Sequence, residues 1–229
     1  MNYSTTQKAI AEFVGTLALI FIGAGSICAN QFLGGDVGLV GIALAHGLTI
    51  AVMVSAIGHI SGGHINPAVT IGVWAAGKIP TREALVYWAA QLAGGLAGAA
   101  LLVLAFDPAT RAAVNLGTPS LASGVTLFQG IVVEVLLTFF LVFTVFATAI
   151  DDRGAFKMVG GFAIGMVVTF DILAGGALTG ASMNPARSFG PAVVANFWTA
   201  HLVYWVGPLA GGLLAGLFYN GVFLRRQNS

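Results

Sequence analysis

The residues of this sequence that could do chemistry begin with a repeated tripeptide. Asparagine, proline and alanine follow one another at Asn66-Pro67-Ala68 and again at Asn184-Pro185-Ala186. Asparagine is a favoured helix N-cap, and proline is favoured at the first helical position because its missing N–H would have no intrahelical partner there. Each copy therefore predicts a loop that turns abruptly into a helix, with a hydrogen-bonding amide at the entry. Since no constellation of nucleophile, base and acid accompanies them, we do not expect an enzyme.

Composition places these tripeptides in a membrane. The 229 residues are 58% hydrophobic and 7% charged, with a mean hydropathy of +0.94, values that a soluble domain of this length could hardly keep in solution. A stretch of about 20 apolar residues is long enough to cross about 30 Å of hydrocarbon. Six such stretches occur, at Ala9–Ala29, Val37–Ile57, Ala84–Phe106, Leu127–Ile150, Met158–Leu178 and Leu202–Leu224.

Few partners other than a lipid bilayer suit this composition. A net charge of +1 provides no basic patch that could neutralise the phosphates of a nucleic acid. The single cysteine, Cys28, excludes an internal disulfide and a cysteine-clustered metal site, and we expect neither a metal nor a cofactor. Because Met1–Gln7 is polar and the first apolar stretch is long enough to span, we expect that stretch to stay as an anchor.

The basic residues indicate how the chain crosses the membrane. If six spans alternate, one side receives Lys8, Lys78, Arg82, Arg153, Lys157, Arg225 and Arg226. Arg111 falls on the other side, and Arg187 belongs to the second tripeptide. The positive-inside rule then puts both termini in the cytoplasm. We expect an integral multi-pass protein of the plasma membrane.

The chain is a single domain built from two halves that repeat each other. Glu12 corresponds to Glu134 and Asn66 to Asn184, at the similar offsets 134−12 = 122 and 184−66 = 118. Because each half holds three spans, the halves enter the membrane from opposite sides, which defines an inverted repeat. The domain extends over 1–229. Its two halves extend over about 8–106 and 127–225, and the connector between them over 107–126. The predicted fold is an all-α membrane protein with six transmembrane helices and two re-entrant half-helices.

Each tripeptide lies between the second and third spans of its half and begins a half-helix. Pro67 to about Ala76 and Pro185 to about Ala195 are each on the order of ten residues, or about 15 Å of helix. Two such half-helices from opposite faces would meet near the midplane of a core about 30 Å thick. Non-helical backbone is tolerated at that depth only where it is buried or lines a wet cavity. We therefore expect a pore lined by the backbone carbonyls of Gly62, Gly63, His64, Thr179 and Gly180.

The longer strings around both tripeptides, together with the repeated glutamate, resemble the aquaporin family of major intrinsic proteins. The strings are His59-Ile-Ser-Gly-Gly-His-Ile-Asn-Pro-Ala-Val-Thr and Ser182-Met-Asn-Pro-Ala-Arg-Ser-Phe-Gly-Pro-Ala. The resemblance implies a homotetramer of six-span protomers, each with its own pore. It also implies that Asn66 and Asn184 donate to one passing water oxygen, so that water passes and protons do not.

The same resemblance implies a selectivity filter near the outer mouth, made of His46, Ile172, Ala181 and Arg187. Strictly water-selective members typically have Phe, His and a Thr or Cys at the first three positions, and this sequence departs from all three. The set is similar to that of tonoplast-type and related ammonia-permeable aquaporins. We therefore expect a passive channel for water, and also for ammonia, that excludes protons and ions.

Other functions stay open from the sequence alone. A glycerol or urea facilitator is disfavoured by Ser188, because glycerol-conducting members generally have Asp there. A filter wider than that of strictly water-selective members nevertheless leaves urea and peroxide open as solutes. A structural membrane protein with a vestigial pore is the alternative from another class, against which the intact Asn66, Asn184 and Arg187 argue.

Three acidic residues are expected inside the membrane, where charges are costly. For Glu12 and Glu134 the resemblance implies a structural role, in which they accept hydrogen bonds from the unpaired amides of the re-entrant loops. Asp171 could either cap nearby backbone or tune the charge of His46 or Arg187.

Overall fold

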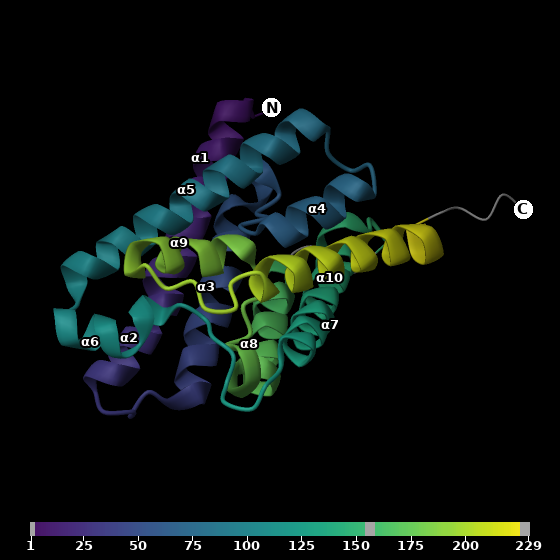
Figure 1. Ribbon diagram of the computed structural model, residues 1–229. Helices are drawn as coiled ribbons and strands as arrows, with labels where there is room; N and C mark the ends of the chain where they lie inside the picture. The colour runs from purple at the N-terminus through teal and green to yellow at the C-terminus, as the bar shows by residue number, and fades with distance from the viewer. Residues whose placement is uncertain (1–2, 154–158, 225–229) are drawn as a thin grey trace, which may run out of the picture.

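The computed structural model describes residues 3–153 and 159–224, and every regular element in these ranges is a helix (Figure 1). The first half contains α1 (Thr5–Leu19), the π-helical turn η1 (Ile20–Ala24), α2 (Gly25–Phe32), α3 (Gly38–Ser61), α4 (Pro67–Ala75) and α5 (Thr81–Ala105). The connector contains α6 (Pro108–Ala113) and the 3-10 turn η2 (Asn115–Gly117). The second half contains α7 (Leu127–Val145), η3 (Phe146–Ile150), α8 (Gly160–Thr179), α9 (Pro185–Ala195), α10 (Val203–Tyr219) and η5 (Asn220–Leu224).

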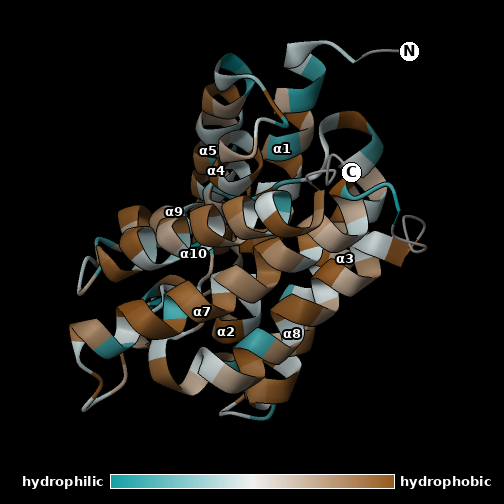
Figure 2. Ribbon diagram, turned by 90° about the vertical axis from the view of Figure 1, so that its right-hand side faces the viewer, coloured by the Kyte–Doolittle hydropathy of each residue, from teal (hydrophilic) through white to brown (hydrophobic). Residues whose placement is uncertain are grey.

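Six helical segments are long and apolar enough to cross a membrane, which confirms the predicted number of spans. They are Thr5–Phe32, Gly38–Ser61, Thr81–Ala105, Leu127–Ile150, Gly160–Thr179 and Val203–Leu224. Figure 2 shows hydrophobic residues along these helices and hydrophilic residues toward their ends and loops. Four residues named in the sequence-based topology lie outside the described ranges: Lys157, Met158, Arg225 and Arg226.

The two halves pack in matching ways. Helix α1 packs on α5 in the first half as α7 packs on α10 in the second, and α3 and α8 pack on each other. The half-helix α4 packs on α10, and the half-helix α9 packs on α5. Each half-helix therefore lies against the last span of the opposite half. This arrangement is the inverted repeat with two re-entrant half-helices that the sequence predicts.

Glycines let these helices approach closely. A β-carbon at Gly98 of α5 would lie 2.7 Å from the carbonyl oxygen of Leu17 in α1. On α4, a β-carbon at Gly72 would lie 2.6 Å from the carbonyl oxygen of Gly212 in α10. Any larger side chain would push the paired helices apart, so these small residues hold the half-helices close to the spans.

The two re-entrant loops share one backbone course. Left-handed φ angles occur at Gly62 (92°), Gly63 (64°) and Ile65 (56°) in the first loop, and at Gly180 (82°), Ala181 (44°) and Met183 (53°) in the second. The residues other than glycine seldom adopt this conformation. Their left-handed backbone turns each loop back from the end of a span to the asparagine that opens the half-helix.

Candidate functional site

The two asparagines cap their half-helices, as the tripeptides predict. The side-chain oxygen of Asn66 accepts a hydrogen bond from the backbone N–H of Ala68 at 2.7 Å. The side-chain oxygen of Asn184 accepts from the N–H of Ala186 at 3.0 Å and of Arg187 at 3.3 Å. Each oxygen is therefore committed to its own half-helix.

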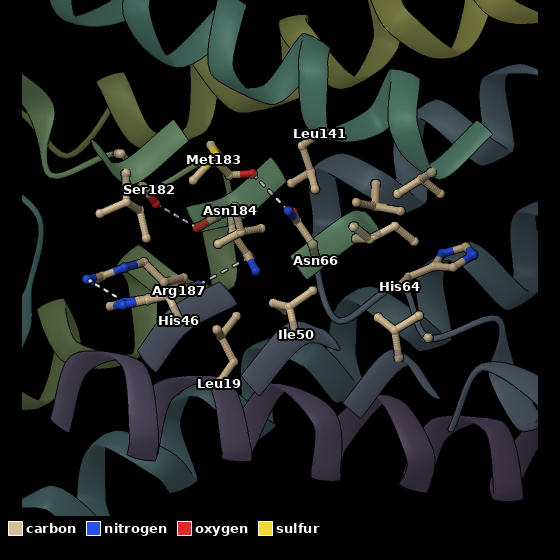
Figure 3. Close-up of a pocket in the computed structure, with 18 residues that line it drawn as sticks. Leu19, His46, Ile50, His64, Asn66, Leu141, Ser182, Met183, Asn184 and Arg187 are labelled. Carbon is tan, nitrogen blue, oxygen red and sulfur yellow. Dashed lines mark hydrogen bonds between the residues drawn. The ribbon is translucent and has the colours of Figure 1, made fainter. Parts of the chain in front are cut away.

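The nitrogens of the same two side chains link the halves of the molecule reciprocally. The Nδ2 of Asn66 donates to the backbone oxygen of Met183 at 2.8 Å, and the Nδ2 of Asn184 donates to the backbone oxygen of Ile65 at 3.0 Å. Figure 3 shows the two asparagines side by side at the middle of a cavity. An amide nitrogen carries two hydrogens, so each asparagine keeps one N–H beyond the bond to the opposite loop.

Two buried glutamates hold the re-entrant loops. Glu12 accepts hydrogen bonds from the backbone N–H groups of His64 at 2.9 Å and Ile65 at 2.6 Å. Glu134 accepts from those of Ser182 at 2.9 Å and Met183 at 2.7 Å. Both carboxylates are fully buried. They satisfy loop amides that would otherwise be unpaired inside the membrane, where a missing partner costs free energy.

The cavity between the half-helices is narrow and has one apolar wall. Its volume is about 30 Å³, whereas one water molecule needs about 10–15 Å³ by the same measure. The apolar side chains around it come mainly from the spans: Leu19, Ile50, Val54, Leu141, Val145, Ile164, Val168 and Ile172. Polar groups come from His46, His64, Ser182, Arg187 and the two asparagines. A cavity of this size admits small molecules in single file.

All four predicted filter residues line this cavity and are almost completely buried: His46, Ile172, Ala181 and Arg187. In Figure 3, His46 and Arg187 lie beside each other at one end of the cavity, with His64 toward the other. The Nη2 of Arg187 is 3.5 Å from the Nε2 of His46. Spans α3 and α8, the second re-entrant loop and the half-helix α9 thus bring together residues that are far apart in the sequence.

The tautomer of His46 follows from its neighbours. Its Nδ1 lies 2.9 Å from the backbone oxygen of Ile42, and a carbonyl can only accept, so Nδ1 carries the hydrogen. The Nε2 atom then presents a lone pair toward the guanidinium of Arg187. This end of the cavity therefore presents the guanidinium of Arg187 beside the imidazole of His46.

The connector supplies a filter contact that the sequence did not reveal. The Nη1 of Arg187 donates to the backbone oxygen of Gly117 at 2.7 Å. Leu116 and Gly117 both have left-handed backbone, with φ angles of 55° and 73°, which turns the chain near the guanidinium. Turn-prone composition predicts a loop here, but only the tertiary fold determines which carbonyl reaches Arg187.

The predicted pore carbonyls are distributed less evenly than expected. Gly63 and His64 line the cavity, whereas Gly62 lines a separate hollow at the end of α3. The backbone oxygen of Thr179 accepts a hydrogen bond from the Tyr204 hydroxyl at 2.8 Å, and Gly180 packs against Pro119. In the second re-entrant loop, the residues before Asn184 that line the cavity are instead Ala181, Ser182 and Met183. The repeat could have indicated this, because these residues correspond to Gly63, His64 and Ile65.

Asp171 has a different environment from the one expected for a backbone cap. Its side chain is 1% exposed on α8, and its Oδ2 atom has no hydrogen-bond partner among the described residues. The contacts therefore do not support the capping role, and a pairing with His46 or Arg187 is not found among the described hydrogen bonds.

The fold and this cavity define a class: six-span helical membrane proteins with a narrow pore between two inverted halves. Comparison with known proteins then gives the family. The family model described as major intrinsic protein matches residues 1–219, and the chain belongs to this family. It is an integral multi-pass membrane protein.

Curated relatives are similar over nearly the whole chain. Aquaporin TIP4-4 of Zea mays is 50% identical over 225 residues, which cover 95% of this chain and 87% of the relative. Aquaporin TIP2-1 of Arabidopsis thaliana is 45% identical over 229 residues, which cover 97% and 90%. The solved structure of the aquaglyceroporin from Plasmodium falciparum has a TM-score of 0.86 and 24% identity, and covers 96% of this chain and 97% of that one. The last match establishes the fold alone.

Proposed function

We propose that this protein is a passive channel for water and ammonia that excludes protons and ions. The observation that carries the proposal is the pair of asparagine amides at the middle of the cavity. Each amide uses its oxygen for its own half-helix and one N–H for the opposite loop. Only the second N–H of each is left for a passing molecule, and the names of the TIP-type aquaporin relatives agree with water as that molecule.

Proton exclusion follows from the donors at this point. A water oxygen that accepts from both asparagines has no lone pair left to accept a proton from its neighbour in the file. The N-termini of α4 and α9 each add roughly half a positive charge, and both are directed at the same place. These fields raise the energy of hydronium and other cations, whereas a neutral molecule such as water carries no net charge to be repelled.

Ammonia permeation is proposed from the filter. Ile172 gives the filter one apolar wall, so the opening is less polar than one with a histidine at that position. Ala181 takes little space, which leaves the opening wider. Ammonia has a smaller need for hydrogen bonds than water, and His46 can serve as an acceptor through Nε2. No covalent step and no cofactor enter this proposal.

The assembly and its orientation are part of the same proposal. We propose a homotetramer with both termini in the cytoplasm. The Nζ atom of Lys8 lies 3.0 Å from the Oε1 atom of Glu83 at the start of α5, and Arg153 donates a hydrogen bond to the backbone oxygen of Phe223 near the C-terminus at 2.5 Å. These contacts agree with a single side of the membrane for Lys8, Arg153 and the two termini. The TIP-type relatives speak against the plasma membrane expected from the sequence, since the tonoplast-type group is the one whose filter this chain resembles.

Stopped-flow measurement of the full-length chain in proteoliposomes tests the proposal. Water and ammonia should each enter much faster than in empty liposomes, and glycerol should not. The double variant His46→Phe with Ile172→His should lose ammonia flux by roughly tenfold, because two aromatic rings in place of one narrow the mouth, while water flux is retained. Water permeability equal to that of empty liposomes would sink the channel assignment, and unchanged ammonia flux in the double variant would sink the filter assignment.

A further inference from the structure

An apolar groove lies between the half-helix α4 and the first two turns of α5, away from the pore. Its lining is Ile71, Trp74, Thr81, Ala84, Leu85 and Trp88, and its volume is about 260 Å³. The α5 members have the spacing of one helical face, as do the two from α4. Other faces of α4 pack on α10, and other faces of α5 pack on α1 and α9. The groove therefore opens outward, where Leu85 is 64% exposed.

The two tryptophans in the groove present only carbon to an occupant. The Nε1–H of Trp74 donates to the Thr81 hydroxyl at 3.0 Å, and the Nε1–H of Trp88 donates to the backbone oxygen of Pro67 at 3.1 Å. Their polar atoms are thus already satisfied inside the protein. An occupant must be apolar along this length, because it would find no free donor or acceptor in these rings.

Two cations stand at the end of the groove where α4 gives way to α5. Lys78 and Arg82 are exposed and form no ion pair or side-chain hydrogen bond within the described part of the chain. The neighbouring carboxylate of Glu83 does not neutralise them, because both of its oxygens lie 3.0 Å from the Lys8 ammonium. The two cations do not line the groove, but they lie in the chain on either side of its lining residue Thr81, so positive charge is concentrated where α4 connects to α5.

We infer that this groove binds one acyl chain of an anionic phospholipid, with the phosphate held by Lys78 and Arg82. The apolar lining suits the chain, and the charge of the two cations complements the headgroup. A lipid with a zwitterionic headgroup would fill the groove equally well but would gain less from the cations. A second copy of this chain is the competing occupant, and it would have to bring an acidic side chain to the same place.

Quenching of tryptophan fluorescence tests this inference. The chain has four tryptophans; replacing Trp198 and Trp205 with Phe leaves only the two in the groove. Vesicles of phosphatidylcholine then receive a small share of phosphatidylglycerol or phosphatidylcholine with brominated acyl chains, which quench on contact. Each basic residue near an anionic lipid contributes a factor of about five in affinity, so brominated phosphatidylglycerol should quench several-fold more per molecule.

Matched variants separate the headgroup from the groove. Lys78→Gln with Arg82→Gln should abolish the preference for phosphatidylglycerol, whereas Arg111→Gln, on the other side of the membrane, should keep it. Ala84→Leu fills the groove and should weaken quenching by both lipids, whereas Ala89→Leu on an exposed face of α5 should not. Native mass spectrometry of the chain with all four tryptophans repeats the lipid comparison, should the Phe background fold poorly.

Several results would overturn the inference. Equal quenching by the two brominated lipids would show that the groove does not select an anionic headgroup. A preference that survives the double glutamine variant would show that Lys78 and Arg82 do not hold the headgroup. A disulfide between two copies carrying Leu85→Cys would show that a second copy covers the groove. The single native cysteine, Cys28, is buried and does not confuse that measurement.

Discussion

At the scale of single residues, the filter depends on how His46 is held. Its ring is fixed at one nitrogen by the Ile42 carbonyl and faces Arg187 with the other. Gly23, in the π-helical turn η1, packs directly against the ring: a β-carbon there would lie 2.6 Å from Cδ2 and 2.7 Å from Nε2 of His46. The absence of a side chain at position 23 therefore lets the His46 ring keep its place in the proposed filter.

Gly23→Ala should displace the His46 ring toward the cavity and reduce water permeability several-fold. Overpacking of a tight interior also costs about 1–3 kcal/mol, so the melting temperature should fall. Stopped-flow shrinkage of proteoliposomes measures the first effect. Gly221→Ala is the matched control, since a β-carbon at Gly221 would meet nothing within 4 Å. Equal water permeability in both variants would show that the ring position does not limit flow.

Asp171 makes a second prediction at this scale. Its Oδ2 atom is buried and has no hydrogen-bond partner among the described residues, and such an unsatisfied group costs about 1–3 kcal/mol. Asp171→Asn replaces an ionisable carboxyl with an uncharged amide of similar shape, which costs less free energy to bury than an unpaired carboxylate. The melting temperature should rise, by about 2–4 °C for each kcal/mol gained at this chain length. Asp36→Asn, at an exposed position, is the control and should leave the melting temperature unchanged. A fall in melting temperature for Asp171→Asn would mean that Asp171 has a partner that stabilises it.

At the scale of elements, the sequence predicts the spans and half-helices well but not how their backbones are used. The length and hydropathy of the apolar stretches are enough to predict the six spans. The two tripeptides are enough to predict where α4 and α9 begin. The five-residue π-helical turns Ile20–Ala24, Phe146–Ile150 and Asn220–Leu224 were not foreseen, because hydropathy does not distinguish i→i+4 from i→i+5 bonding. The carbonyl of Thr179 was expected to line the pore but accepts a hydrogen bond from Tyr204, and the carbonyl of Gly117 was not foreseen as a partner of Arg187. Both pairings join residues that are distant in the sequence.

Asp151, which follows the π-helical turn η3 and lies outside the spans, forms hydrogen bonds that connect this end of the fourth span to the end of α10. Asp151 accepts hydrogen bonds from the Arg153 guanidinium at 2.7 and 2.8 Å and from the Tyr219 hydroxyl at 3.2 Å. The hydrogen bonds from Arg153 hold the pKa of the Asp151 carboxyl well below its usual range. A carboxyl with a lowered pKa in the folded state stabilises the fold above its unfolded pKa, and this stabilisation is lost as the pH falls.

Asp151→Asn should therefore lower the melting temperature at neutral pH, and the gap should close in acid. The difference from the parent chain should be constant above about pH 5 and shrink below about pH 4, since an unfolded aspartate has a pKa of about 3.9. Thermal unfolding in detergent across this pH range measures it. Arg153→Gln removes the same contact from the other side and should give the same pH dependence. A gap that persists unchanged in acid would assign the loss to packing and not to the ionised carboxylate.

At the scale of the whole molecule, the two halves make equivalent contacts with each other at the asparagines. Each half supplies one half-helix that packs on the last span of the other half, one glutamate that holds its own loop, and one amide that reaches the opposite loop. The bonds from Asn66 to Met183 and from Asn184 to Ile65 differ by only 0.2 Å, 2.8 against 3.0 Å. The centre of the pore is thus a contact between halves, and its properties should respond equally to the same change in either one.

Asn66→Asp and Asn184→Asp test this equivalence and the proton barrier together. Aspartate is as good an N-cap as asparagine, so each half-helix keeps its cap while the bond to the opposite loop is lost and a negative charge replaces a donor. Hydronium should then be stabilised where the two helix N-termini opposed it, and proton leak should rise by about tenfold, which is about 1.4 kcal/mol off the barrier. A pH-sensitive dye inside proteoliposomes with a clamped potential measures the leak. The two variants should show the same proton leak, and the control Asn220→Asp at the end of α10 should show none. A proton leak in only one of the two variants would contradict the equivalence of the halves. The absence of a proton leak in both would place the proton barrier elsewhere in the pore.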